Sequence, residues 1–520
     1  MNNQNNWAAK LPPTPRLTPW QERPGIAYPF LFILAVILVL PSNAARPLLH
    51  DSFAIDWVWA DQFTSELARG ILYPRWLPNS DGGLGAPVFY YYPPLAFYVS
   101  AVFGLLGLST YASIIATFAA AFFGSGIACW HWLKGHCSQP LLGAAFFVVA
   151  PYHLLDYTVR GALAESVAIG LIPVVAIGLR RIAERRGGKI LTAISYGAMI
   201  GSHLPLALLV SVFLIAPTAL AARRQMVHVA TAAALGIALS AVYLVPALAL
   251  EPFHDVGQLY RTPNLQTAYW AVYNGHWSDP TFTMVMFIIV SILFAAALPA
   301  LRRRDGWAQY SMAMALLVSG IIPLLWSMPL LQKVQFPYRA LPLAEFGLAT
   351  ALARLPRREL LAKLFFLLPL LLSIMIVPGF HIPGDNLARL RTLHPDVYEY
   401  LPRGVMKRGQ TKARLADILA ARVPPPKVAG MVVEDHFYFP SWSCGEAEPR
   451  TQLLIHSKTC HPRLVLTKPE KLGLFVSIVA GSFLGLMAWL ASVTNPAVLA
   501  ARFARIMPTS SPASRAPDGA

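Results

Sequence analysis

Long apolar runs separated by short basic segments constrain the fold of this chain more strongly than any other feature. The hydrocarbon core of a bilayer is about 30 Å thick and an α-helix rises about 1.5 Å per residue, so long apolar runs predict membrane-crossing helices. We expect about 12 of them, at residues 28–45, 111–130, 140–152, 165–180, 190–203, 204–221, 227–249, 283–300, 308–328, 340–354, 360–379 and 472–493. Because 56% of the residues are hydrophobic and the mean hydropathy is +0.51, the sequence indicates an all-α polytopic membrane protein.

Basic residues are confined to short clusters between the apolar runs. The clusters are Lys134; Arg180, Arg181, Arg185, Arg186 and Lys189; Arg223 and Arg224; Arg302, Arg303 and Arg304; Arg354, Arg357 and Arg358; and Arg502 and Arg505. Cytoplasmic loops are marked in this way, and the clusters fall on one side only if residues 95–108 lie at the outer interface and do not cross. The net charge of +17 therefore reflects membrane topology, and we expect no nucleic-acid partner.

This topology divides the chain into five parts. Residues 1–27 are a cytoplasmic tail, 28–379 a transmembrane module, 472–493 the last membrane helix and 494–520 a disordered cytoplasmic tail. Residues 380–470 are polar and contain alternating runs such as "GMVVEDHFYFPSW", which predict a small β-rich domain on the outer face. Cys444 and Cys460 lie there and could either pair or remain free thiols.

The first outer segment, residues 46–110, has an unusual composition. Residues 54–69 show apolar residues at helical spacing, which predicts an amphipathic helix at the membrane interface. The following stretch, "RWLPNSDGGLGAPVFYYYPPL" at 75–95, combines turn-forming glycines with a run of aromatic residues. Arg75 and Tyr91 are its candidate substrate-binding residues, although an ordinary outer loop with an aromatic belt is an equal alternative.

Three acids follow the first membrane exit within a dozen residues. They are Asp51, Asp56 and Asp61, and His50 directly precedes the first of them. A carboxylate just outside the bilayer can act as a general base if it lies within hydrogen-bond reach of an attacking hydroxyl. Asp51 and Asp56 are therefore candidate catalytic residues, with His50 beside them as a candidate binding residue, although any single Asp can simply cap a helix.

Other ionisable residues are expected at the same membrane edge. "YTVRGALAES" places Arg160 and Glu165 there, where a charge is costly unless it is paired or used. The two could pair with each other, or either could face a cavity. His203 in "GSHLPL" is a further candidate, although such a histidine is more often a packing residue.

"KVQFPYRALPL" sets two cations, Lys333 and Arg339, at the outer headgroup level. An arginine there can hold a phosphate through two hydrogen bonds, whereas the alternative for either residue is ordinary interfacial snorkelling. The sequence contains no HExxH, paired CxxC, P-loop or GxSxG motif. It indicates no metal site and no cofactor, although a divalent metal stays possible.

The order of these motifs resembles the integral-membrane glycosyltransferases of the GT-C superfamily. The resemblance rests on an acid after the first span, "YPRW", "GLGAPVFYYYPPLAFY", "APYHLLDYTVRGALAE", "QFPYR" and "FYFPSW", over residues 46 to 465. It is strongest to a bacterial branch labelled as membrane proteins related to 6-pyruvoyl-tetrahydropterin synthase, a label that says nothing about activity.

The resemblance implies a function and assigns two residues. A GT-C-like fold implies transfer of a sugar from a polyprenyl-phosphate donor to a glycan, lipid or protein acceptor at the outer face of a bacterial inner membrane. The superfamily base carries over to Asp51, and the branch's second acid to Glu165. Where the branch commonly has a His after the first acid, this chain has Asp56. The choice between Asp51 and Asp56 therefore stays open, and metal dependence with it.

Such an enzyme would invert the sugar in a single displacement. Two other classes stay open: a flippase or transporter of lipid-linked sugars, and a non-catalytic envelope assembly protein whose outer domain holds a partner. A transporter should carry its polar residues near the bilayer midplane, whereas the acids of this chain gather toward one face.

Overall fold

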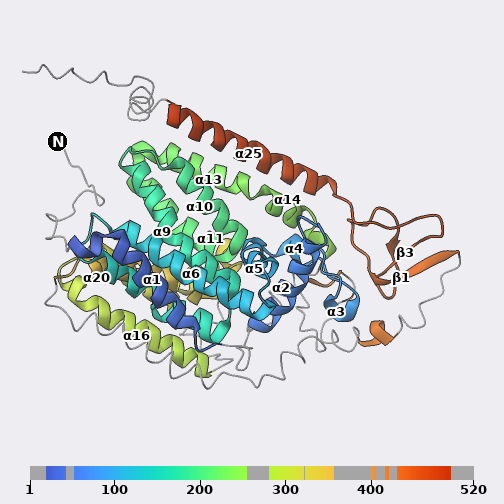
Figure 1. Cartoon of the computed structure of the whole chain (residues 1–520), viewed down its shortest axis with the longest axis horizontal. Helices are drawn as coiled ribbons and strands as arrows, with labels where there is room; N and C mark the ends of the chain where they lie inside the picture. Colours follow the sequence, from blue (N-terminus) through green and yellow to red (C-terminus); the bar gives the residue numbers. More distant parts are fainter. Residues whose placement is uncertain are drawn as a thin grey trace, which may run out of the picture.

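The structure is a computed structural model that describes residues 19–42, 52–254, 280–320, 322–356, 400–403, 405, 416–420 and 430–493. Most of this part is helical, and the long helices run roughly along the longest axis of the molecule (Figure 1). A small sheet and the short helices of the first outer segment lie together at one end (Figure 1, right). The predicted fold class, helices with a small outer sheet, agrees with this architecture.

The N-terminal half contains the helices that frame the candidate site. Its elements are η1 (Pro19–Glu22), α1 (Pro24–Val39), α2 (Ser52–Ala68), α3 (Ser80–Gly83), α4 (Val88–Tyr91), α5 (Leu95–Leu105), α6 (Thr110–Leu133), α7 (Pro140–Val148), α8 (Pro151–Leu155), η2 (Asp156–Arg160), α9 (Leu163–Ala183), α10 (Lys189–Ser202), α11 (Leu204–Val210), η3 (Ser211–Ile215), α12 (Ala216–Ala221), η4 (Arg223–Gln225), α13 (Met226–Leu239), α14 (Ala241–Ala249) and η5 (Glu251–Phe253). Ser109 caps α6 by accepting a hydrogen bond from the backbone N–H of Ala112.

The C-terminal half contains further helices and the sheet. Its described elements are α16 (Pro280–Arg302), α17 (Gly306–Val318), α18 (Pro323–Trp326), α19 (Pro329–Gln332), η9 (Pro337–Ala340), α20 (Leu341–Ala353), β1 (Met431–Phe437), β2 (Glu446–Ala447), β3 (Leu453–Ser457) and α25 (Lys468–Val493). Every residue of α20 is buried, so this helix lies in the centre of the helical core. In contrast, α25 runs along the outside against α13 and α14 (Figure 1).

Five of the expected spans are confirmed as helices long and apolar enough to cross a membrane. They are Thr110–Leu133, Pro140–Arg160, Leu163–Ala183, Leu204–Ala221 and Lys468–Ala491. The expected span 227–249 is instead two helices, Arg223–Leu239 and Ala241–Ala249, bent by 70°. The predicted run 360–379 lies outside the described residues, so the expected count of 12 stays a prediction.

The bend between α13 and α14 has a local cause at Ser240. Its hydroxyl donates hydrogen bonds to the carbonyl oxygens of Gly236 (3.1 Å) and of Gly197 on α10 (2.9 Å). A side chain that takes up a helix carbonyl competes with the backbone ladder and bends the helix. The apolar pattern of residues 227–249 does not predict the bend, because Ser240 is a single small residue within a long apolar run.

The outer sheet confirms the expected β structure between residues 431 and 457. Its three antiparallel strands have the order β1–β3–β2, with Val433 opposite Ile455 and Glu446 opposite the same residue on the other side. Cys444 and Cys460 form a disulfide with their Cα atoms 6.4 Å apart, which decides the alternative left open by the sequence. The predicted boundaries of the outer domain fall partly on residues outside the described part.

Candidate active site

The site begins with a helical segment that carries polar residues at every fourth position. Tyr152, Asp156 and Arg160 follow this spacing from α8 into η2, which places their side chains on one side of the segment. The five residues of η2 form a π-helical turn, a wider turn than the α-helix that precedes it. Such turns occur at functional sites because they redirect side chains. All three side chains are buried.

Gly161 lets the chain reverse between η2 and α9. Its φ of +60° lies in the left-handed region, and a Cβ on this residue would approach the Cβ of Phe53 to 2.5 Å. Only glycine fits both demands at this position. The reversal brings Arg160, at the end of one helix, next to Glu165 in the first turn of the following one.

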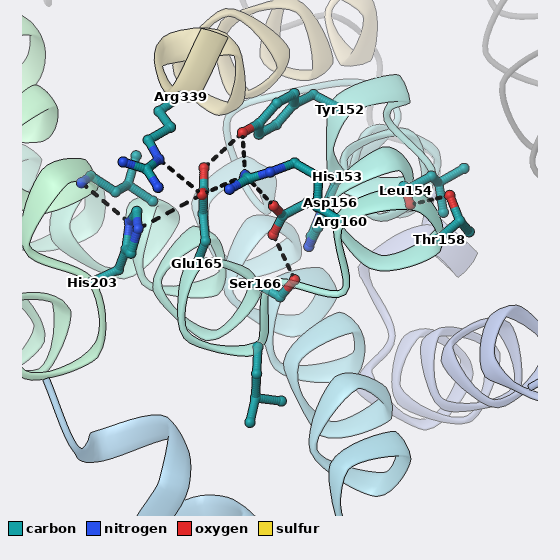
Figure 2. Close-up of polar contacts among 12 residues, drawn as sticks. Tyr152, His153, Leu154, Asp156, Thr158, Arg160, Glu165, Ser166, His203 and Arg339 are labelled. Carbon is teal, nitrogen blue, oxygen red and sulfur yellow. Dashed lines mark hydrogen bonds and ion pairs between the residues drawn. The ribbon is translucent and has the colours of Figure 1, made fainter. Parts of the chain in front are cut away.

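Arg160 is the centre of a network of short polar contacts (Figure 2). Its Nη1 donates to Oε2 of Glu165 (2.7 Å), to Oδ1 of Asp156 (2.8 Å) and to the hydroxyl of Tyr152 (2.9 Å). The Tyr152 hydroxyl in turn donates to Oε1 of Glu165 at 2.8 Å. The second oxygen of Asp156 accepts a hydrogen bond from Ser166 (2.8 Å). The structure therefore confirms the first alternative for Arg160 and Glu165, a direct pair.

Two further groups approach Glu165 from other parts of the chain. Arg339, which lies in η9, places Nε 3.4 Å from Oε2 of Glu165. His203, between α10 and α11, places Nε2 3.7 Å from the same oxygen. Its Nδ1 accepts a hydrogen bond from the backbone N–H of Leu206, which puts the proton of the neutral ring on Nε2. Figure 2 shows both side chains pointing toward Glu165.

The backbone around Arg339 holds its guanidinium group toward the cluster. Nη1 donates to the carbonyl oxygen of Val334 (2.8 Å) and to the side chain of Gln335 (3.2 Å). The ring of Phe336 lies 4.8 Å from the guanidinium carbon. Within the described part of the chain, Nε of Arg339 has no hydrogen-bond partner although it is buried. Its contact with Glu165 at 3.4 Å is therefore an ion pair only, and a buried N–H group that makes no hydrogen bond can donate to an anionic ligand.

Asp56 connects the first outer segment to this cluster. Its side chain is buried on α2, and Oδ2 accepts a hydrogen bond from the backbone N–H of Leu163 at the start of α9 (3.1 Å). This contact satisfies one N–H group at a helix N-terminus, where a negative charge is favoured. The neighbouring Tyr92 links "FYYYPP" to the same region. Burial raises the pKa of Tyr92 well above its usual value, and the Asp56 carboxylate raises it further.

The structure separates the predicted site residues into three groups. It brings Asp56, Arg160, Glu165, His203 and Arg339 together around the start of α9. His50 and Asp51 lie outside the described residues. The other three predicted binding residues, Arg75, Tyr91 and Lys333, have different surroundings.

Arg75 and Tyr91 have other partners. Arg75 pairs with Glu470 at the start of α25, with N and O 3.2 Å apart. The Tyr91 hydroxyl donates to the carbonyl oxygen of Leu250 at 2.6 Å, and its ring packs on His254. Lys333 is exposed on the surface after α19. These contacts place Tyr91 as a residue that joins the first outer segment to η5.

Sequence reasoning missed Tyr152, Asp156 and Ser166. The first two lie in the quoted motif "APYHLLDYTVRGALAE", but no role was expected for them. The signal that could have found them is the spacing of four between Tyr152, Asp156 and Arg160 in an otherwise apolar helix. Glu345 on α20 was missed as well. Its carboxylate accepts hydrogen bonds from the backbone N–H groups of Tyr152 and His153, which fixes the start of α8.

The described residues contain no group of three or more His, Cys, Asp and Glu side chains arranged to hold a metal ion. The arginine and carboxylate groups of the cluster satisfy one another directly. The sequence indicates no metal site, and this expectation stays a prediction because His50 and Asp51 lie outside the described residues.

Solved structures that are similar to this chain include two glycosyltransferase-family structures named below. No family model and no curated protein sequence matches the chain. Arabinofuranosyltransferase AftD from Mycobacteria aligns with 71% of this chain and 30% of its own, at 17% identity and a TM-score of 0.42. ArnT from Cupriavidus metallidurans bound to undecaprenyl phosphate aligns with 65% of this chain and 62% of its own, at 15% identity and a TM-score of 0.36. The chain therefore spans less than two thirds of either structure.

Proposed function

We propose that this chain is a membrane glycosyltransferase of the GT-C type that takes its sugar from a polyprenyl-phosphate donor. The observation that carries the proposal is the convergence of Arg160 and Arg339, from two distant segments, on Glu165 in a buried polar cluster. The sequence motifs that resemble the superfamily contain all three residues. The acceptor is a glycan, lipid or protein at the outer face of a bacterial inner membrane.

The position of the cluster suits a lipid-linked phosphate. Glu165 lies in the first turn of α9, whereas Arg180 and Arg181 lie in its last turn. By the positive-inside rule, the basic end faces the cytoplasm and Glu165 faces the outer side. A polyprenyl phosphate keeps its tail in the bilayer and its phosphate at headgroup height, which is the height expected for this end of α9. A transporter would instead concentrate its charges near the midplane.

The two arginines suit the leaving group of the reaction. In the transfer, the acceptor oxygen bonds to the anomeric carbon while the bond from that carbon to the phosphate oxygen breaks. The electron pair of the broken bond stays on the phosphate, so negative charge grows there. Guanidinium groups fixed beside this oxygen stabilise the growing charge. Arg160 and Arg339 are buried and already held in place, so little reorganisation is needed when the donor binds.

Glu165 has a different role from a general base in this proposal. Both of its oxygens already accept hydrogen bonds, from Tyr152 and from Arg160. We assign it to positioning: it holds the two guanidinium groups together in the absence of donor. The proton of the acceptor hydroxyl then goes to an acid of the first outer segment, Asp51 or Asp56, on the face of the sugar opposite the phosphate. This arrangement gives inversion at the anomeric carbon.

The test is donor cleavage by the purified full-length protein in lipid nanodiscs. The protein is incubated with a panel of radiolabelled polyprenyl-phosphate sugars and a membrane extract as acceptor source, and the released polyprenyl phosphate is measured. Asp51→Asn and Asp56→Asn are compared, and loss of the base should slow transfer about 10²-fold to 10⁴-fold. Asp61→Asn is the matched control, because Asp61 lies on α2 but accepts a hydrogen bond from Thr110 at the start of α6.

Glu165→Gln sharpens the assignment of roles. The amide keeps an acceptor for Tyr152 but removes the charge between the arginines, so we expect a higher KM for the donor. If wild-type protein releases no lipid phosphate from any donor, the proposal is wrong. If the aspartate variants keep sugar transfer but lose movement of the lipid-linked sugar across the bilayer, the chain is a flippase.

A further inference from the structure

A cleft lies outside the cluster, between the first outer segment and the sheet. This cleft has a volume of about 520 Å³. One wall consists of Tyr73, Arg75, Trp76 and Tyr90 from the first outer segment, and the other of His436 and Trp442 beside β1. Leu464, Val465 and Leu466, just before α25, complete it. No role for this cavity follows from the proposed reaction.

Aromatic faces dominate the cleft. Trp76 and Trp442 meet edge to face with ring centroids 5.8 Å apart, and His436 stacks on Trp442 at 4.4 Å. Gly85 lies directly behind Trp76, since a Cβ on this glycine would approach the indole ring to 2.5 Å. The indole of Trp76 therefore packs directly against the backbone of Gly85, which fixes the orientation of the ring. Trp442 stays half-buried.

Both arginines of the cleft lie next to a carboxylate. Arg69 pairs with Glu66 at 2.6 Å, and Arg75 pairs with Glu470 at 3.2 Å. The remaining acid, Asp435, is exposed on β1 and has no recorded partner within the described residues. Each arginine already contacts a carboxylate, and the three acids of the lining outnumber the two arginines, so the charge of the cleft disfavours an anionic ligand. The cleft therefore favours a ligand that is uncharged and rich in hydroxyl groups.

We propose that this cleft binds a neutral saccharide, and that the saccharide is the acceptor of the proposed transferase. The C–H groups of a sugar ring carry partial positive charge and stack on the negative faces of aromatic rings, which Trp76 and Trp442 present. Hydroxyl groups donate hydrogen bonds to a free carboxylate, which Asp435 supplies. Few polar groups among aromatic walls are typical of a ligand site. The choice of acceptor rests on the proposed function, whereas sugar binding does not.

One short segment borders both sites. Tyr90 lines the cleft, and two residues later Tyr92 lies near Asp56 of the cluster. Burial raises the pKa of Tyr90, and the Glu470 carboxylate, a residue of the cleft, raises it further. "FYYYPP" therefore separates the candidate acceptor cleft from the candidate donor cluster by a single turn of chain, α4. The proximity suits an acceptor that is held on one side while its terminal hydroxyl reaches the other.

Binding to defined sugars tests this inference without any donor. The full-length protein in detergent is applied to an array of neutral oligosaccharides, and affinities for the retained ones are measured by microscale thermophoresis. The same sugars coupled to a dodecyl chain are then measured in nanodiscs, which distinguishes a free saccharide from a lipid-anchored one. We expect at least one neutral oligosaccharide to bind in one of the two forms.

Two variants of the cleft should weaken that binding. Trp442→Ala removes the half-buried aromatic face and should weaken affinity about tenfold or more, as expected for an aromatic residue at the centre of an interface. Asp435→Asn changes an exposed side chain and leaves the fold intact, so it should weaken affinity by a smaller factor. Trp20→Ala is the matched control, because Trp20 is 47% exposed on η1, a different part of the molecule.

The outcomes separate this inference from the proposed function. Glu165→Gln should bind the oligosaccharide like wild type and differ from it only in a higher KM for the donor. No retained sugar in either form, or equal affinity in wild type and in Trp442→Ala and Asp435→Asn, overturns the inference while leaving the transferase proposal standing. Sugar binding that depends on Trp442 in a protein that cleaves no donor would support the cleft and reject the transferase.

Discussion

The polar cluster at α9 and the aromatic cleft beside the sheet use arginine in opposite ways. In the cluster, Arg160 contacts two carboxylates, Asp156 and Glu165, and Arg339 contacts the second of them, so these four charged groups form one connected network. In the cleft, each arginine has its own carboxylate. The difference teaches which ligand each site suits. Two guanidinium groups that converge on one carboxylate can both contact an added phosphate, whereas the separate pairs of the cleft bring no two arginines to one point.

Among the variants considered, Arg160→Ala should lower the stability of the protein the most. Arg160→Ala leaves the buried carboxylates of Asp156 and Glu165 close together without their shared guanidinium. Loss of one partner of a buried ion pair costs about 3–5 kcal/mol, so the variant should melt at a clearly lower temperature in detergent and lose donor cleavage. Thermal unfolding and lipid-phosphate release measure both effects.

The matched control for that variant is Arg181→Ala, which truncates an exposed arginine in the last turn of α9, the helix that follows η2. The free energy of unfolding of this control should stay within about 0.5 kcal/mol of the wild-type value. Arg75→Ala removes one ion pair in the cleft, and its loss of stability should lie between those of Arg160→Ala and Arg181→Ala. Equal destabilisation by Arg160→Ala and Arg181→Ala would contradict the structural importance assigned to the cluster.

Loss of the disulfide should affect the cleft and spare the cluster. The Cys444–Cys460 bond joins residues 16 positions apart. A disulfide that closes a loop of that length stabilises the folded state by about 3 kcal/mol. The double variant Cys444→Ser with Cys460→Ser should therefore increase hydrogen exchange in β1 and β3 and weaken saccharide binding. Donor cleavage should stay near the wild-type rate.

Wild-type protein treated with a reducing agent provides the comparison for the double variant, because both treatments remove the same bond. The two preparations should show the same exchange pattern. A double variant with unchanged exchange in the sheet but reduced donor cleavage would reverse the assignment of the two regions.

The smallest expected effect is a pH dependence confined to the sheet. The hydrogen bond from His456 on β3 to Glu434 on β1, 2.8 Å long, raises the pKa of His456. Because the folded-state pKa exceeds the unfolded one, the added stability is present at low pH and is lost as pH rises through the folded-state pKa. Exchange in β1 and β3 should therefore increase slightly as the pH rises from about 6 to 8.

His456→Gln is the control for this effect, since glutamine keeps a hydrogen-bond donor but does not titrate. Its exchange rates, corrected for intrinsic pH dependence, should be flat across the same interval. A wild-type sheet with the same flat profile would show that the contact adds nothing to stability.

Most of the cluster could be predicted from the sequence because its residues have a physical signature. Arg160, Glu165 and Arg339 are charged residues at the ends of apolar runs, where an unpaired charge is unfavourable. Asp56 was expected from its distance to the first membrane exit. The sequence could not indicate which of these residues touch, because the contacts join segments that are far apart in the chain.

The contacts of Arg75 and the bend at Ser240 could not be predicted for a related reason. Arg75 belongs to a motif that the resemblance emphasises, yet its partner Glu470 lies nearly 400 positions later, at the start of the last helix. Ser240 changes the helix direction through a hydrogen bond to α10. Hydropathy describes each segment alone, so it cannot report an interaction between two segments.

The π-helical turn that precedes Gly161 carries a consequence for how this protein tolerates insertions and deletions. A π turn contains one residue more than an α turn. Deleting one residue from Asp156–Arg160 would leave only enough residues for a regular α turn, in which the side chains of this segment point in other directions. The guanidinium of residue 160 would then swing toward another neighbour. The additional residue of the π turn determines where the Arg160 side chain points. The number of residues in this turn is therefore as constrained as their identity.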